Sequence, residues 1–147
     1  MSNISSHTAT DARFTIVKKG VDEVVNNSNV YQNDDELLFQ VAANEQVNFL
    51  LFLYFSSAAA ADIKWKLTLP AGASGTAQYM LGAVINSIDL SGINADGTGI
   101  ANKLCLMIIG HINTAATPGQ VTLQWAQNTA DASDTKVYAG SQVVVYR

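Results

Sequence analysis

The sequence predicts an all-β protein, an antiparallel β-sandwich of jelly-roll type with an extended N-terminal arm. Short apolar segments with strand-like alternation are separated by turn residues at intervals of about 8–12 residues, which is typical of sandwiches and barrels. No long stretch has the 3.6-residue apolar period of a helix. The 147 residues are enough for one domain with a proper core. We expect residues 1–12 to be the arm and residues 13–147 to be a single domain.

The first eleven residues are polar and rich in Ser and Thr, a composition typical of a loose terminal segment. We interpret them as an arm that docks on a neighbouring protein, with folding back onto the domain as the alternative. The stretch has neither a basic n-region nor an apolar h-region, so a signal peptide is not expected. The residues expected to make this contact are Ser2, Asn3, Ile4, Ser5, Ser6 and His7.

Alternation and turn signals place the strands. Asn33, Asp34 and Asp35 predict a turn, and Pro70 ends a strand because proline cannot donate to a sheet ladder. Trp65 and Trp125 fall on inward positions of their strands and are expected in the core. The predicted strands are residues 14–19, 36–41, 47–55, 63–69, 103–112, 120–127, 137–138 and 142–146, with a weak strand pair in 78–88 and loops at 71–76, 90–99 and 128–135.

Two of these strands, 47–55 and 103–112, are apolar on both faces. One face can line the core, but each large apolar side chain left in water on the other forgoes about 1.5–3 kcal/mol. We expect the cover to be another copy in a closed homo-oligomer, with a trimer favoured; the alternative is that the loop 91–99 covers this face. The residues expected at the subunit interface are Leu50, Phe52, Tyr54, Cys105, Met107 and Ile109.

The sequence contains few residues of the types that form catalytic or metal-binding sites. The only histidines are His7 and His111, and the second is expected to have a hydrogen-bonded structural role. Cys105 is the only cysteine, so a disulfide within the chain is impossible, and we expect its side chain to serve as a small core hydrophobe. The acidic segments 33–36 and 89–96 lack the spaced oxygen ligands of a calcium loop, and we interpret them as solvated turns. Neither a nucleotide fingerprint nor a nucleophile motif occurs, so we expect no enzyme, cofactor or metal.

The composition suits a protein that buries much of its surface in an assembly. Apolar residues make up 48% and charged ones only 14%, against about a quarter in an average domain. The net charge is −4 and the eight basic residues are scattered, so nucleic-acid binding is not expected. The longest apolar stretch, residues 49–61, is shorter than the ~20 residues of a membrane-spanning helix. We therefore expect a soluble protein, cytoplasmic at synthesis and without a membrane partner.

Several short segments carry a resemblance. They are 33–37 (NDDEL) with 41–45 (VAANE), 61–64 (ADIK) with 69–73 (LPAGA), and 121–128 (VTLQWAQN) with 131–132 and 139–141 (AGS). Together they span roughly residues 31–147, and the WAQN element with the downstream AGS is the most specific part. With these segments the sequence resembles virion structural proteins of tailed phages and prophages.

The resemblance implies a jelly roll similar to the trimeric fold of tumour necrosis factor and C1q. It implies a capsid decoration or cement protein that trimerises on the head exterior and stabilises the shell, with the major capsid protein as partner. The protein would then be a virion component assembled in the host cytoplasm. The alternative is a tail or fibre-tip module that binds a host glycan through loop 91–99. A more distant alternative is a free-standing carbohydrate-binding or C1q-like recognition domain.

Overall fold

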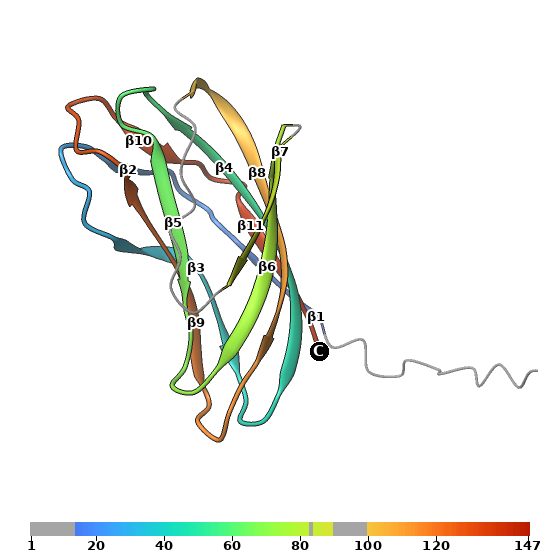
Figure 1. Ribbon diagram of the computed structural model, residues 1–147. Helices are drawn as coiled ribbons and strands as arrows, with labels where there is room; N and C mark the ends of the chain where they lie inside the picture. The colour runs from blue at the N-terminus through green and yellow to red at the C-terminus, as the bar shows by residue number, and fades with distance from the viewer. Residues whose placement is uncertain (1–13, 83, 90–99) are drawn as a thin grey trace, which may run out of the picture.

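The computed structural model describes residues 14–82, 84–89 and 100–147 (Figure 1). All regular elements in these ranges are β-strands, and every strand pair is antiparallel, which confirms the predicted fold class. The predicted arm and the loop 90–99 lie outside the described residues. The strands are β1 (Phe14–Lys18), β2 (Glu23–Val25), β3 (Gln32–Val41), β4 (Gln46–Ser57), β5 (Ile63–Thr68), β6 (Ser74–Leu81), β7 (Val84–Asp89), β8 (Ile100–Asn113), β9 (Gly119–Gln127), β10 (Thr135–Val137) and β11 (Gln142–Tyr146).

The strands form two sheets that face each other across the core (Figure 1). The larger sheet has the order β1-β11-β4-β8-β6-β7, and β10 joins it by pairing with both β4 and β2. The smaller sheet has the order β3-β9-β5. One hydrophobic cluster contains side chains from both sheets, which establishes a β-sandwich. The jelly-roll type stays a prediction.

Strand β4 lies in the middle of the larger sheet, between β11 and β8. Its side chains alternate between two environments, as the sequence predicts. Phe49, Leu51 and Phe55 are at most 2% exposed and face the smaller sheet. Leu50 and Phe52 point the other way and are only half-buried. The apolar residues of this one strand therefore serve both the core and the opposite face.

The two tryptophans occupy the centre of the core, as predicted. Trp65 in β5 and Trp125 in β9 are register partners within the smaller sheet, and both are almost completely buried. The ring of Tyr79, in the larger sheet, meets Trp65 edge-on with 5.9 Å between ring centroids. Edge-to-face aromatic pairs of this kind add to the stabilisation from burial alone, so this contact helps to join the two sheets.

The predicted turn at residues 33–35 is wrong, because these residues lie inside β3. The register between β3 and β9 shifts between Asn33 and Leu38, which marks a β-bulge or irregularity. Asp34 is completely buried and its Oδ1 accepts hydrogen bonds from the backbone N–H groups of Glu36 and Leu37, at 3.0 and 2.8 Å. The interpretation of Asp34 as part of a solvated turn is also wrong, because its side chain is buried within the strand. The carboxylate of Asp34 replaces backbone hydrogen-bond partners that the irregular strand has lost.

Other strands extend further than their predicted limits. Strand β6 begins at Ser74, within the predicted loop 71–76, and β8 begins at Ile100. The predicted weak strand pair in 78–88 corresponds to the hairpin of β6 and β7. Strand β11 matches its predicted limits, Gln142 and Tyr146.

Gly110 in β8 allows the ring of Phe49 to pack directly against the backbone. A Cβ atom built on this glycine would lie 2.8 Å from Cζ of Phe49 and 2.6 Å from the carbonyl oxygen of Thr76. Both distances are shorter than van der Waals contact, and the carbonyl belongs to the paired strand β6. The inner face of the larger sheet therefore requires glycine at this position.

We expect Gly110→Ala to lower the free energy of unfolding by about 1–3 kcal/mol, the usual cost of overpacking a core. Denaturant unfolding measures the change. Gly119→Ala is the matched control, because its Cβ would lie 3.1 Å from Cγ of Pro70, so a smaller loss is expected. A Gly110→Ala protein as stable as the wild type would contradict the packing described here.

Candidate subunit interface

The larger sheet presents an apolar surface on the side that faces away from the smaller sheet; we call it the outer sheet face. Strand register aligns its side chains in rows that run across the sheet. One row runs over four strands and consists of Ile16, Val144, Leu50 and Ile109. The next row consists of Phe52, Met107, Met80 and Ile85.

Large apolar side chains on this face are strongly exposed. Ile109, near the middle of the sheet, is 56% exposed, and Ile85 on the edge strand β7 is 62% exposed. Phe14, Ile16 and Tyr146, from β1 and β11, are about half exposed. Single exposed apolar residues are ordinary, but a contiguous patch rimmed by polar groups marks an interaction site.

All six predicted interface residues lie together on the outer sheet face. The register between β4 and β8 places Leu50 opposite Ile109, Phe52 opposite Met107, and Tyr54 opposite Cys105. Except for the more exposed Ile109, they are half-buried. Their contact with another subunit stays a prediction.

Half of this face was missed by sequence reasoning. The missed residues come from strands that flank β4 and β8, and they are Phe14, Ile16, Met80, Ile85, Val144 and Tyr146. The sequence of residues 142–146 contains the signal, because three consecutive valines place apolar side chains on both faces of a strand. In the structure Val143 and Val145 are buried and Val144 is not. This third strand is also apolar on both faces, and its place beside β4 makes the outer sheet face wider than predicted.

Cys105 does not belong to the core, so its expected role as a small core hydrophobe is wrong, whereas it does lie on the same face as the other predicted interface residues. It is half-buried on the outer sheet face, opposite Tyr54, because the alternation of β8 turns Leu106 inward. Burial raises the pKa of the thiol, and a hydrogen bond with Tyr54 opposes this only in part. The thiol is therefore protonated at neutral pH and is a poor nucleophile.

Charged side chains lie at the margins of this face among the residues that the structure describes. Lys18 is on the edge strand β1, and Lys103 lies at one end of β8. The Nζ atom of Lys103 lies over the rings of Tyr54 and Tyr138, 5.3 and 4.7 Å from their centroids. These cation–π contacts hold the lysine at the border. The eight residues named in the two central rows are uncharged, and the register continues the second row through Gln142 to Lys18 at the β1 edge.

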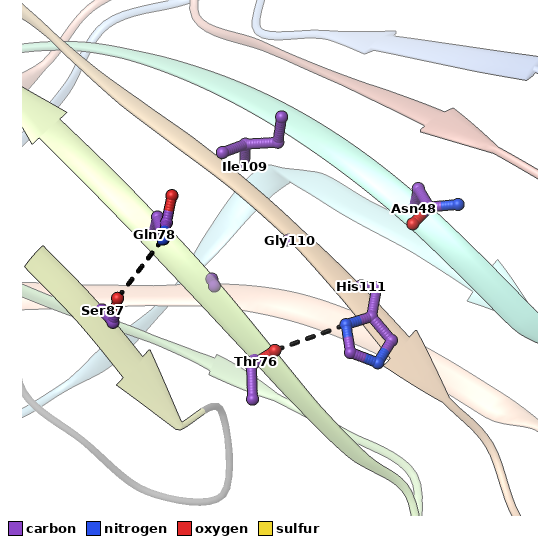
Figure 2. A pocket seen from close by; sticks show the side chains of 8 residues that line it. Asn48, Thr76, Gln78, Ser87, Ile109, Gly110 and His111 are labelled. Carbon is purple, nitrogen blue, oxygen red and sulfur yellow. Dashed lines mark hydrogen bonds between the residues drawn. The ribbon is translucent and has the colours of Figure 1, made fainter.

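A polar hollow of 540 Å³ adjoins the apolar rows (Figure 2). Figure 2 shows two hydrogen bonds at its walls, one between Thr76 Oγ1 and His111 Nδ1 at 3.3 Å and one from Gln78 Nε2 to Ser87 Oγ at 3.5 Å. His111 therefore has hydrogen-bonded partners, as predicted, although its side chain is exposed. The lining residues are Asn48, Thr76, Ala77, Gln78, Ser87, Ile109, Gly110 and His111.

Neither a metal site nor a membrane-spanning helix is found in the described residues. No group of three or more His, Cys, Asp or Glu residues in 14–82, 84–89 and 100–147 is arranged to hold a metal ion. Over the same ranges, none of the elements is a helix with the length and apolar character needed to cross a membrane. The candidate site is the outer sheet face, because it combines exposed apolar side chains from neighbouring strands.

No protein-family model matches this chain, and no curated protein matches it. Among solved structures, the chain is similar to the tripod from the baseplate of bacteriophage Tuc2009, with 8% identity and a TM-score of 0.37 over 100% of this chain and 70% of that one. It is also similar to a structure of infectious bursal disease virus Gt strain, with 9% identity and a TM-score of 0.27 over 94% of this chain and 38% of that one. Likenesses at this level do not define a shared fold.

Proposed function

We propose that the protein is a virion structural protein that assembles into a homotrimer through the outer sheet face. The observation that carries the assembly is the row of apolar side chains across β1, β11, β4 and β8, with Ile109 56% exposed near its middle. The virion role and the trimer follow the resemblance of the sequence to phage structural proteins. In this proposal the protein acts by assembly and not by catalysis.

Energetics favour covering this face. Full burial of one large apolar side chain is worth about 1.5–3 kcal/mol, and the net stability of a domain is only about 5–15 kcal/mol. Phe14, Ile16, Ile85, Ile109 and Tyr146 are each about half exposed or more, so a partner would bury a substantial further area. Because these side chains are about half exposed, covering the face would recover roughly half of that value for each of them, before the cost of association is subtracted.

A second copy of the chain is a suitable cover for this face. The eight residues named in its two central rows are uncharged, so copies that meet along these residues bring no like charges together, provided that Lys18, at the β1 end of the second row, stays at the rim. Closed symmetric homo-oligomers are also the usual way in which a soluble protein covers such a surface. The proposed interface includes the six residues predicted from the sequence and the six that flank them.

The arm is proposed to bind the major capsid protein on the head exterior. Strand β1 begins at Phe14, two positions after the arm, and it is one of the two edge strands of the larger sheet. Phe14 lies on the outer sheet face, so an arm that binds the capsid would start from this side of the domain. In a trimer, three arms would start near the interface and reach outward to the shell, where they would cement neighbouring capsid subunits.

The trimer is tested by Ile109→Asp. Because Ile109 is 56% exposed in the single chain, we expect the variant to remain folded but to lose the trimer mass in light scattering, and its melting temperature should fall because the stabilisation from assembly is lost. Cys105 should then react faster with a maleimide than in the wild type. Gln40→Asp, an exposed position on the smaller sheet, is the control and should remain trimeric. A folded Ile109→Asp protein with the wild-type oligomer mass would exclude this interface.

Deleting residues 1–11 tests the arm. We expect the truncated protein to keep its oligomer mass and to lose binding to purified capsids, measured by co-sedimentation. Oligomer mass and capsid binding are measured separately, so that loss of assembly is not mistaken for loss of the arm contact. Undiminished capsid binding would remove the arm from the proposal.

Copy number in purified virions distinguishes a head from a tail role. A decoration protein is expected in hundreds of copies spread over the shell, measured by quantitative mass spectrometry and imaging of labelled particles. A few copies at one vertex would instead support the tail or fibre-tip module. Absence from the particle would contradict the virion role.

A further inference from the structure

A buried lysine and a buried aspartate connect the two sheets. Lys19 directly follows β1 of the larger sheet, and Asp34 lies in β3 of the smaller sheet. Both side chains are 0% exposed. The Nζ atom of Lys19 lies 3.1 Å from both carboxylate oxygens of Asp34. Glu23, whose side chain is 14% exposed, contacts the same Nζ through Oε2, and Oε2 of Glu36 lies 3.8 Å away.

We propose that Lys19 and Asp34 form an intramolecular isopeptide bond, with Glu23 as the group that carries protons between them. The Nζ atom attacks Cγ of Asp34, an N–C bond forms, and one C–O bond of the carboxyl group breaks. The products are an amide and one water molecule. An ammonium and a carboxylate together hold the protons that the amide and the water need, so no oxidant, reductant or other reactant is required.

The geometry places the reacting atoms close together. Because both oxygens of Asp34 are 3.1 Å from Nζ, the carbon between them lies at about 3–3.5 Å, the distance of a near-attack arrangement. The backbone N–H groups of Glu36 and Leu37 donate to Oδ1, and Nε1 of Trp125 donates to Oδ2 at 3.3 Å. These donors fix the carboxyl group and stabilise the negative charge that develops on its oxygen during the attack.

Protons must move within the cluster before the bond forms, since the attack needs a neutral amine and a protonated acid. Burial lowers the pKa of Lys19, but hydrogen bonds to Glu23 and Asp34 outweigh it and raise that pKa above its usual value. Burial also raises the pKa of Glu23, although Lys19 opposes it. The raised pKa of Lys19 opposes loss of its proton. Geometry places Glu23 to accept that proton and return it to the departing hydroxyl, because its carboxylate contacts the amine and lies beside the carboxyl group of Asp34.

Burial of Lys19 and Asp34 favours the uncharged amide over the ion pair. A buried ion pair pays a desolvation penalty for each charge, whereas the amide leaves neither charge in the core. The bond would tie the larger sheet to the smaller one at a point away from the outer sheet face. The proposal is therefore independent of the trimer and of the virion role.

The intact mass of the purified full-length chain tests the bond. We expect the wild type to be lighter by one water than its sequence requires, after allowing for removal of Met1. Lys19→Arg keeps a buried cation but cannot form the bond, and it should have the full mass. Lys18→Arg, at the exposed neighbouring position, is the matched control and should still lack one water. Glu23→Gln should fold and keep the full mass.

Peptide mapping locates the bond. A protease that cleaves after glutamate separates Glu23 from Val24, so Lys19 and Asp34 fall on different peptides, and these should remain joined. Asp34→Asn would expel ammonia instead of water and give a product of the same mass as the wild type. A folded wild type of full mass overturns the proposal and leaves an ordinary buried ion pair. A loss of water that persists in Lys19→Arg also overturns it, and if that variant does not fold, the wild-type digest decides.

Discussion

Strand β4 is apolar on both of its faces, and the two sheets of the described structure are arranged around it. On the inner face, Phe49, Leu51 and Phe55 are covered by the smaller sheet and by the tryptophan pair of β5 and β9. Among residues 14–82, 84–89 and 100–147, no third layer lies on the other face. The flanking strands β8 and β11 continue the apolar surface, so the need for cover extends beyond one strand.

Local alternation was sufficient to predict which side chains line the core. Phe49, Trp65 and Trp125 face inward as the period of two requires, and β11 has its predicted limits. The segment around Asp34 was mispredicted, because acidic and amide residues normally favour turns. Its burial depends on Lys19, fifteen residues earlier in the chain, and a contact between strands of different sheets leaves no periodic signal.

Only half of the residues of the candidate interface could be predicted from the sequence, because the other half depends on the order of the strands in the sheet. Leu50 and Ile109 belong to strands that are apolar on both faces, which a single sequence reveals. Phe14 and Met80 join them only because β1 and β6 take places in the same sheet, and strand order is a property of the whole fold. Cys105 was assigned to the core from the general behaviour of free cysteines, whereas the alternation of β8 turns it outward.

The pairing of β1 with β11 brings the two ends of the domain to one corner. Phe14 is the register partner of Tyr146, and Nη1 of Arg147 donates a hydrogen bond of 3.0 Å to Oγ1 of Thr15. A short linker between residues 147 and 14 would therefore close the chain with little disturbance to the sheet, and new ends opened at a surface turn would give a circular permutant. A cargo fused after Arg147 would start beside Phe14, so it would lie next to the first residue of the domain that the structure describes.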